Sequence, residues 1–221
     1  FVDDDQFSLM GGINNTNNMG FTDFAAAAFG GGPGGGRHRF GGFGAGNGIT
    51  SSGNVGTNFS KRLMKDLTVG GNVRFSGSDN EARAKTDRQN ILAGDSTSFD
   101  HAESASDTRT RNVGFNLHME WKPDSLTQVI FRPEFSYGTT HTDAEELTHT
   151  LSGSLDSVNA SRSRSRVDGH ALTASAKLDV SRKLNSRGRT LTLSVSGGGN
   201  QSIDNTQNRS DTRFLLFADS T

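Results

Sequence analysis

The chain has 221 residues with a formal net charge of −1, no cysteine, 28 glycines and 31% hydrophobic residues. Ordinary globular domains use about 45–50% apolar residues with glycine counted among them. Glycine supplies much of that class here and has no side chain to bury, so a conventional core is under-supplied, and the lack of cysteine excludes a disulfide framework and a thiolate zinc site. The balance of 23 basic and 24 acidic residues argues against a dedicated nucleic-acid binder, and no apolar run is long enough for a membrane-spanning helix.

Alternation of apolar and polar residues is the strongest pattern in the chain, and a period of two predicts β-strands. In chain order the alternation occurs at residues 7–13, 49–59, 67–76, 112–122, 127–140, 172–180, 190–196 and from 213 to the C-terminus. The sharpest case has five alternate apolar residues, Val113, Phe115, Leu117, Met119 and Trp121, with polar residues or glycine between them. The sequence therefore predicts an all-β protein of about eight strands.

The connections between these segments alternate in length. Short polar turns are expected at 61–66, 122–125 and 183–188, and long polar segments at 16–48 (Gly-rich), 78–111, 142–165 and 197–211. Short turns alternating with long loops are typical of outer-membrane β-barrels, in which one side of each strand faces lipid and the other faces a polar interior. We therefore predict that residues 1–221 are part of a single antiparallel transmembrane β-barrel domain, with short periplasmic turns and long extracellular loops. A polar interior also explains the low hydrophobic content.

The sequence resembles a known family over residues 7–80. The run GGGPGGGRHRFGGFGAGNG at 30–48, followed by ITSSGNVGTNFSKRLMKDLTVGGNVRFSGSDN, is similar to the TonB-dependent-receptor-like outer-membrane β-barrel family of Bacteroidetes-type bacteria, as is the opening FSLMGGINNTNNMGF. The resemblance implies a bacterial outer-membrane receptor that takes up a bound solute. It also implies TonB and a surface lipoprotein as partners through regions outside this chain, which is expected to be a fragment of the barrel without the plug domain.

Two sets of residues are candidates for the barrel surfaces. The lumen-facing candidates are the polar residues that alternate with the apolar ones: Asn72, Arg74, Asn116, His118, Glu120, Arg132, Glu134, Lys177 and Asp179. Barrels also carry aromatic residues at both membrane interfaces. Phe59 and Trp121 beside short turns, and Tyr137 beside a long loop, are the expected interface aromatics.

Two groups of arginines precede predicted strands and continue the alternate positions that the apolar residues of those strands occupy. Counted in steps of two, Arg109 and Arg111 fall on the same face as Val113. Arg162, Arg164 and Arg166 fall on the same face as Leu172. These five arginines are the candidates for the lipid-facing side. Guanidinium groups bind phosphate through two parallel hydrogen bonds, so we expect these residues to contact lipopolysaccharide phosphates of the outer leaflet. A solvated arginine run in a flexible loop is the alternative.

No enzymatic motif is present. The glycines lack the lysine or helix that a phosphate loop requires, and there is no nucleophile elbow or zinc helix. The six histidines are scattered, so no catalytic residue, metal site or cofactor is predicted. The stretch SRSRSR at 161–166 is too short to indicate nucleic-acid binding. A secreted or surface-displayed β-rich adhesin or structural protein without a pore remains the alternative, and the two classes differ in which face of the strands is dry.

Overall fold

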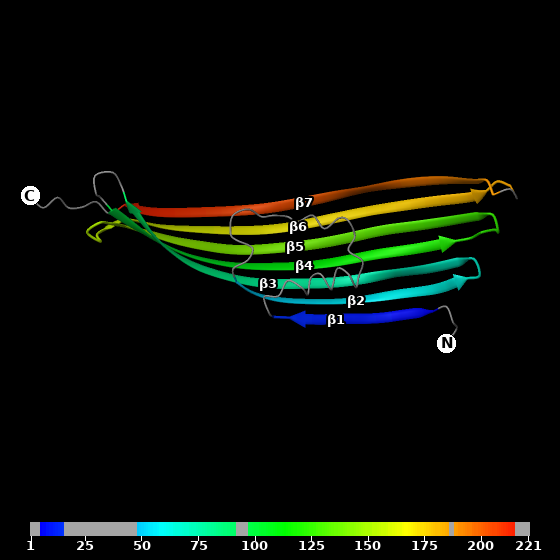
Figure 1. The fold of residues 1–221 in the computed structure, drawn as a ribbon, viewed down its shortest axis with the longest axis horizontal. Coiled ribbons are helices and arrows are strands. Elements are labelled where there is room, and N and C mark those ends of the chain that lie inside the picture. The colour runs from blue at the N-terminus through cyan, green and yellow to red at the C-terminus, as the bar shows by residue number, and fades with distance from the viewer. Residues whose placement is uncertain (1–4, 16–47, 92–96, 186–187, 215–221) are drawn as a thin grey trace, which may run out of the picture.

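A single antiparallel sheet accounts for the regular structure in the computed structural model, which describes residues 5–15, 48–91, 97–185 and 188–214. Its seven strands lie side by side in chain order: β1 (Gln6–Asn14), β2 (Ile49–Met64), β3 (Leu67–Ile91), β4 (Thr97–Trp121), β5 (Thr127–Ser152), β6 (Ser157–Lys183) and β7 (Thr190–Phe214). Figure 1 shows these strands as one curved layer. The prediction of an all-β antiparallel fold is confirmed. None of the described residues forms a helix with the length and apolar character needed to cross a bilayer.

The short connections are confirmed and most of the long ones are wrong. Turns join β2 to β3, β4 to β5 and β6 to β7 where the sequence predicts them. The expected loops at 78–111, 142–165 and 197–211 are instead strand, apart from residues 92–96, which are not described, and a turn at 153–156. The expected eighth strand began at Arg213, which lies in the last two residues of β7. The Gly-rich segment at 16–47 and residues 215–221 lie outside the described residues.

Strand pairing continues through the predicted loops because facing side chains complement one another. Lys85 Nζ lies 2.6 Å from Glu103 Oε1 across β3 and β4, and Thr108 Oγ1 lies 3.2 Å from Thr142 Oγ1 across β4 and β5. Cross-strand ion pairs and hydroxyl pairs each add to sheet stability. The ladder therefore extends without apolar alternation.

The register brings the apolar residues of the strands onto one face. Residues directly paired in antiparallel strands point to the same side of the sheet. One such row runs across all seven strands: Leu9, Thr57, Val73, Phe115, Phe135, Ala174 and Gly199. We call the surface formed by alternate residues of 67–75, 113–121, 129–137 and 172–180, with the residues of β1, β2 and β7 that continue its rows, the apolar band.

The sheet has no second layer and no closed edge among the described residues. No described side chain is fully buried, and Phe75 and Leu193 in and beside the apolar band are 53% and 61% exposed. Strand β1 pairs only with β2, and β7 pairs only with β6. The described residues thus form an open sheet, and the closed barrel stays a prediction.

Pro133 interrupts the ladder between β4 and β5. Pairing is continuous from Ser98↔Ser152 to Asn116↔Glu134 and resumes at Met119↔Phe131. On its other side Pro133 pairs with Ala176 of β6. Proline has no N–H to donate, so the interruption lies on the side where its nitrogen faces β4.

Candidate functional site

The apolar band is nine residues high on each central strand and has an aromatic residue at each edge. Trp121 pairs with Leu67 and Val129 at the short-turn edge, and Tyr137 pairs with Val113 and Leu172 at the opposite edge. The two edges are about 26 Å apart along the strands. Trp121 Nε1 donates to Asp66 Oδ2 at 3.1 Å, which fixes the indole at the turn. Strands that cross a bilayer need about 9–11 residues, so the height of the band matches a membrane span.

Phe59 does not lie at an edge. It pairs with Gly71, four residues into the band from Leu67, and a Cβ on Gly71 would lie 3.3 Å from the Phe59 ring. The ring therefore covers the glycine in the middle of the band. The prediction of an interface position for Phe59 is wrong, because nearness to a turn in sequence does not give depth in the band.

The turns at the short-turn end are staggered, which gives the tilt of the strands. One row of paired residues runs through Leu67, Trp121, Val129, Val180 and Leu193. The midpoints of the β2–β3, β4–β5 and β6–β7 turns lie about 1.5, 4 and 6.5 residues below this row, a stagger visible in Figure 1. The descent of about 16 Å over about 19 Å of sheet width corresponds to strands tilted by about 40° from the normal to the plane of the turns. Membrane barrels have strand tilts of about 35–45°.

The face opposite the apolar band is polar, and it carries all nine lumen-facing candidates. Register aligns Asn72, Asn116 and Glu134 in one row, and Arg132 pairs with Lys177 two residues lower. Asn116 Nδ2 donates to Asn72 Oδ1 at 3.1 Å. The sheet therefore brings these residues together on one surface, whereas their position in a lumen stays a prediction.

The charged residues of this polar face form two ion-paired groups near the short-turn end. Arg132 Nη1 donates to Asp179 Oδ2 at 3.0 Å, and Lys177 Nζ lies 3.4 Å from Asp179 Oδ1. Arg132 Nε also donates to His118 Nδ1 at 3.3 Å. These contacts join β4, β5 and β6 across the polar face.

Glu120 is the centre of the second group. Lys122 Nζ lies 2.7 Å from Glu120 Oε1, and Gln128 Nε2 donates to the same oxygen at 2.8 Å. Higher on the polar face, the guanidinium of Arg74 lies over Gly114, where a Cβ would be 3.6 Å from Arg74 Nη2. The carboxylates of Glu120 and Asp179 are thus neutralised by Lys122, Lys177 and Arg132 across the polar face.

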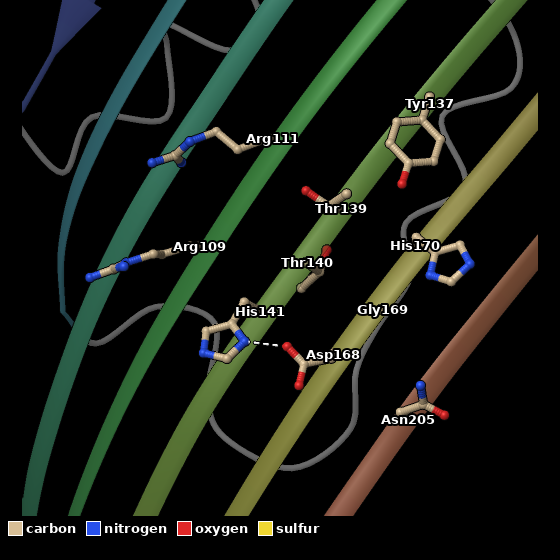
Figure 2. A pocket seen from close by; sticks show the side chains of 10 residues that line it. All are labelled: Arg109, Arg111, Tyr137, Thr139, Thr140, His141, Asp168, Gly169, His170 and Asn205. Atoms are coloured by element: carbon tan, nitrogen blue, oxygen red, sulfur yellow. Dashed lines mark hydrogen bonds and ion pairs between the residues drawn. The ribbon is translucent and has the colours of Figure 1, made fainter.

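A shallow depression of about 390 Å³ lies directly beyond the Tyr137 edge of the apolar band. Its lining includes Tyr137, Thr139, His141, Asp168, His170 and Asn205, shown in Figure 2. Arg109 and Arg111 also contribute to the lining, and in Figure 2 their side chains run towards β3. Arg111 is used within the sheet, because its Nη2 contacts both Asp79 carboxylate oxygens at 2.9 and 3.0 Å and its Nη1 donates to two backbone carbonyls.

His141 joins two carboxylates in this region. Its Nδ1 lies 2.5 Å from Asp168 Oδ1 and its Nε2 lies 2.7 Å from Asp143 Oδ2. The hydrogen bond with Asp168, followed by that with Asp143, raises the pKa of His141 above its ordinary value of 6.5, and His141 in turn lowers the pKa of Asp168. The described residues hold no group of three or more His, Asp or Glu side chains arranged for a metal ion.

The five candidate arginines lie on the face of the apolar band, in strands rather than in loops. Arg162 donates to Glu145, Arg164 Nε lies 3.7 Å from the same carboxylate, and Arg166 Nε lies 3.3 Å from Asp168 Oδ2. The bond from Arg162 is the main cause that lowers the pKa of Glu145. The alternative of a flexible loop is wrong for Arg162, Arg164 and Arg166, since all three lie within β6.

Sequence reasoning missed the acidic partners of these arginines. The acidic residues at 143–146 and the arginines at 162–166 are placed symmetrically about the turn at 153–156, so a hairpin pairs them. That symmetry of opposite charges was the available signal.

The described residues thus define an all-β sheet that separates an uncovered apolar surface from a polar one. Comparison of the sequence with protein-family models and with curated proteins finds no match.

Proposed function

We propose that this chain is part of an outer-membrane β-barrel receptor or transporter, in which lipid covers the apolar band and the polar face lines a lumen. The observation that carries the proposal is the uncovered apolar band, nine residues high and in register across the sheet. With strands about 4.8 Å apart, the four central strands give the band an area of about 19 Å by about 26 Å along the strands, or about 500 Å². Apolar residues of β1, β2 and β7 extend it, with Thr57, Lys61 and Gln201 among them. The largest apolar patch of a soluble monomer is about 300–600 Å². Hydrocarbon is the solvent that suits such a surface.

Two further features support a membrane location. Trp121 and Tyr137 lie at opposite edges of the apolar band, as interface aromatics of barrels do, and the stagger of the turns gives a strand tilt of about 40°. In hydrocarbon, the free backbone edges of β1 and β7 need partners because each unpaired group costs several kcal/mol. The proposal therefore requires additional strands from outside the described residues.

The resemblance to TonB-dependent-receptor-like barrels extends the proposal. On that basis the protein resides in the bacterial outer membrane and takes up a bound solute, with energy delivered through TonB and with a surface lipoprotein as a further partner. It is a transport protein rather than an enzyme. The ion-paired polar face supports this reading, since a wet lumen tolerates the charges of Arg132, Glu120 and Asp179.

Cysteine labelling of adjacent residues tests the proposal, and the absence of native cysteine makes single-cysteine variants specific. Phe115→Cys lies on the apolar band and Asn116→Cys on the polar face. In membranes we expect a water-soluble maleimide to modify Asn116→Cys and a lipid-soluble one to be needed for Phe115→Cys. The reverse pattern would contradict the barrel. A surface adhesin without a pore predicts that the water-soluble reagent modifies both.

A further inference from the structure

Four arginines gather on the band side of the sheet, well beyond the apolar band. Arg162, Arg164 and Arg166 of β6 lie beside Arg209 of β7, and we call them the arginine cluster. Arg164 pairs directly with Arg209 across the two strands. Like charges placed directly opposite each other destabilise a sheet, so this pair favours a bound anion.

Carboxylates lie beside the cluster, and Glu145 and Asp168 are each shared between two cations. Glu145 serves both Arg162 and Arg164, and the Arg164 contact is 3.7 Å long. Asp168, the nearest acid to Arg166, is also held by His141. Arg166 Nε also lies 3.9 Å from Asp143 Oδ1, and Arg209 Nε lies 3.1 Å from Asp211 Oδ2. At each of two positions along the cluster, a single carboxylate is therefore shared by two cationic side chains.

The terminal nitrogens of the cluster are available for a ligand. Arg162, Arg166 and Arg209 each donate their side-chain hydrogen bonds from Nε, and Arg164 makes none with the described residues. The four side chains are 50–77% exposed. Arg111 differs, because both of its terminal nitrogens are occupied within the sheet. A guanidinium with free terminal N–H groups is suited to a phosphate, which accepts two parallel hydrogen bonds.

The height of the cluster restricts the source of the anion. Arg164 lies eight residues beyond Leu172, the last band residue of β6, which is about 26 Å along the strand and about 20 Å above the band at a tilt of about 40°. A phospholipid headgroup layer is only about 5–8 Å thick. Because the cluster shares the face of the apolar band, it points outward, above the headgroup layer, rather than into the lumen. A phosphorylated saccharide on an outer-leaflet glycolipid has the required reach.

We propose that the arginine cluster binds phosphate groups on the saccharide portion of lipopolysaccharide, about 20 Å above the hydrocarbon. The inference rests on the proposed membrane location and narrows the expected lipid contact to these residues. Arg111 is excluded from it, since its donors are satisfied by Asp79 and two backbone carbonyls.

The test measures lipopolysaccharide retained by the complete protein after purification in mild detergent. The variant Arg164→Gln with Arg209→Gln is compared with Arg83→Gln, which lies in the same row and on the same face but on β3. With lipopolysaccharide that has a phosphorylated core saccharide, we expect the double variant to bind about tenfold more weakly and Arg83→Gln to bind as the wild type does. With lipopolysaccharide truncated to lipid A, wild type and double variant should bind equally.

Three results would overturn the inference: unchanged binding in the double variant, an equal loss in Arg83→Gln, or an equal loss with truncated lipopolysaccharide. A double variant with lysine at positions 164 and 209 keeps the charge and removes the paired N–H geometry. Its affinity for lipopolysaccharide should lie between that of the wild type and that of the glutamine double variant. The labelling pattern of Phe115→Cys and Asn116→Cys, introduced separately into the wild type and the double variant and measured in membranes before detergent is added, reports membrane insertion. Normal labelling with unchanged binding rejects the cluster alone, whereas reversed labelling rejects the membrane location as well.

Discussion

Leu155 has a positive φ of 67°, the one such non-glycine residue in the described part of the chain. It lies in the turn between β5 and β6, and its side chain is 64% exposed, so packing of the side chain does not offset the free-energy cost of the left-handed backbone. A left-handed conformation costs an L-residue about 1–2 kcal/mol. We expect Leu155→Gly to raise the free energy of unfolding by about 0.5–1 kcal/mol in urea titrations. Leu184→Gly, an exposed turn leucine without positive φ, should not stabilise, and equal effects in the two variants would refute the argument.

Gly71 provides a packing test in the apolar band. A Cβ there would lie 2.5 Å from the Asn116 carbonyl oxygen and 3.3 Å from the Phe59 ring. We expect Gly71→Ala to lower the free energy of unfolding by about 1–3 kcal/mol in urea titrations. Gly197, at the same height and on the same face, has no atom within 4 Å of the position that a Cβ would take, so Gly197→Ala should cost far less. Equal costs in the two variants would contradict the packing argument.

His141 gives the sheet a pH dependence. Its pKa is raised in the folded protein, mainly by Asp168, so its stabilising contribution is complete below 6.5 and is lost as the pH rises through the raised value. The pKa of Asp168 is lowered, so its contribution is lost as the pH falls below its ordinary 3.8. Unfolding measurements at a series of pH values should show the wild type losing its advantage over His141→Gln above neutral pH. A constant difference from pH 5 to pH 9 would contradict the assignment.

At the scale of the strands, opposite charges hold the outer hairpin in register. Glu145 faces Arg164, and Arg209 lies beyond Arg164 in the same row. Glu145→Arg places three guanidinium groups next to one another on β5, β6 and β7, and we expect amide hydrogen exchange in β5 and β6 beyond the band to accelerate several-fold. Adding Arg164→Glu restores alternating charge and should restore protection. Equal exchange in the single variant and the wild type would show that the ladder needs no charge pairing.

The sequence predicted the strands within the apolar band and not their extensions. Alternation of Val113 to Trp121 identifies both the strand and its apolar face, because a period of two is a direct consequence of strand geometry. The segment around Asp143 has no apolar alternation, so its strand state depends on partners about twenty residues away. Interpreting apolar alternation as the only strand signal therefore ended each strand too early.

The candidate surfaces were also predicted only in part: the face on which a residue lies was predicted, but its contacts and its depth in the band were not. Parity alone placed Asn72, Asn116 and Asp179 on one face, since it depends only on the strand period. Contacts such as Arg111 with Asp79 depend on register between strands, which the sequence did not supply. The depth of Phe59 was missed for the same reason.

The orientation proposed for the whole sheet predicts the depth of Trp121 in a bilayer. Trp121 is the only tryptophan in the chain and lies at the short-turn edge of the apolar band. In vesicles of lipids brominated at defined carbons, we expect its fluorescence to be quenched most by bromines near the headgroups. Phe115→Trp combined with Trp121→Phe moves the probe six residues into the band and should shift the strongest quenching towards the bilayer centre. Identical depth profiles would contradict the proposed orientation.

The length of β5 and β6 beyond the apolar band has a practical consequence. From Tyr137 to Ser152, β5 continues for fifteen residues, about 50 Å along the strand and about 38 Å of height at the tilt derived from the turns. The turn at 153–156 would thus stand clear of the surrounding leaflet on a paired support. In the proposed outer-membrane orientation, an antibody epitope inserted there should be accessible on intact cells, so this hairpin offers a position for a tag that tests for the protein at the cell surface.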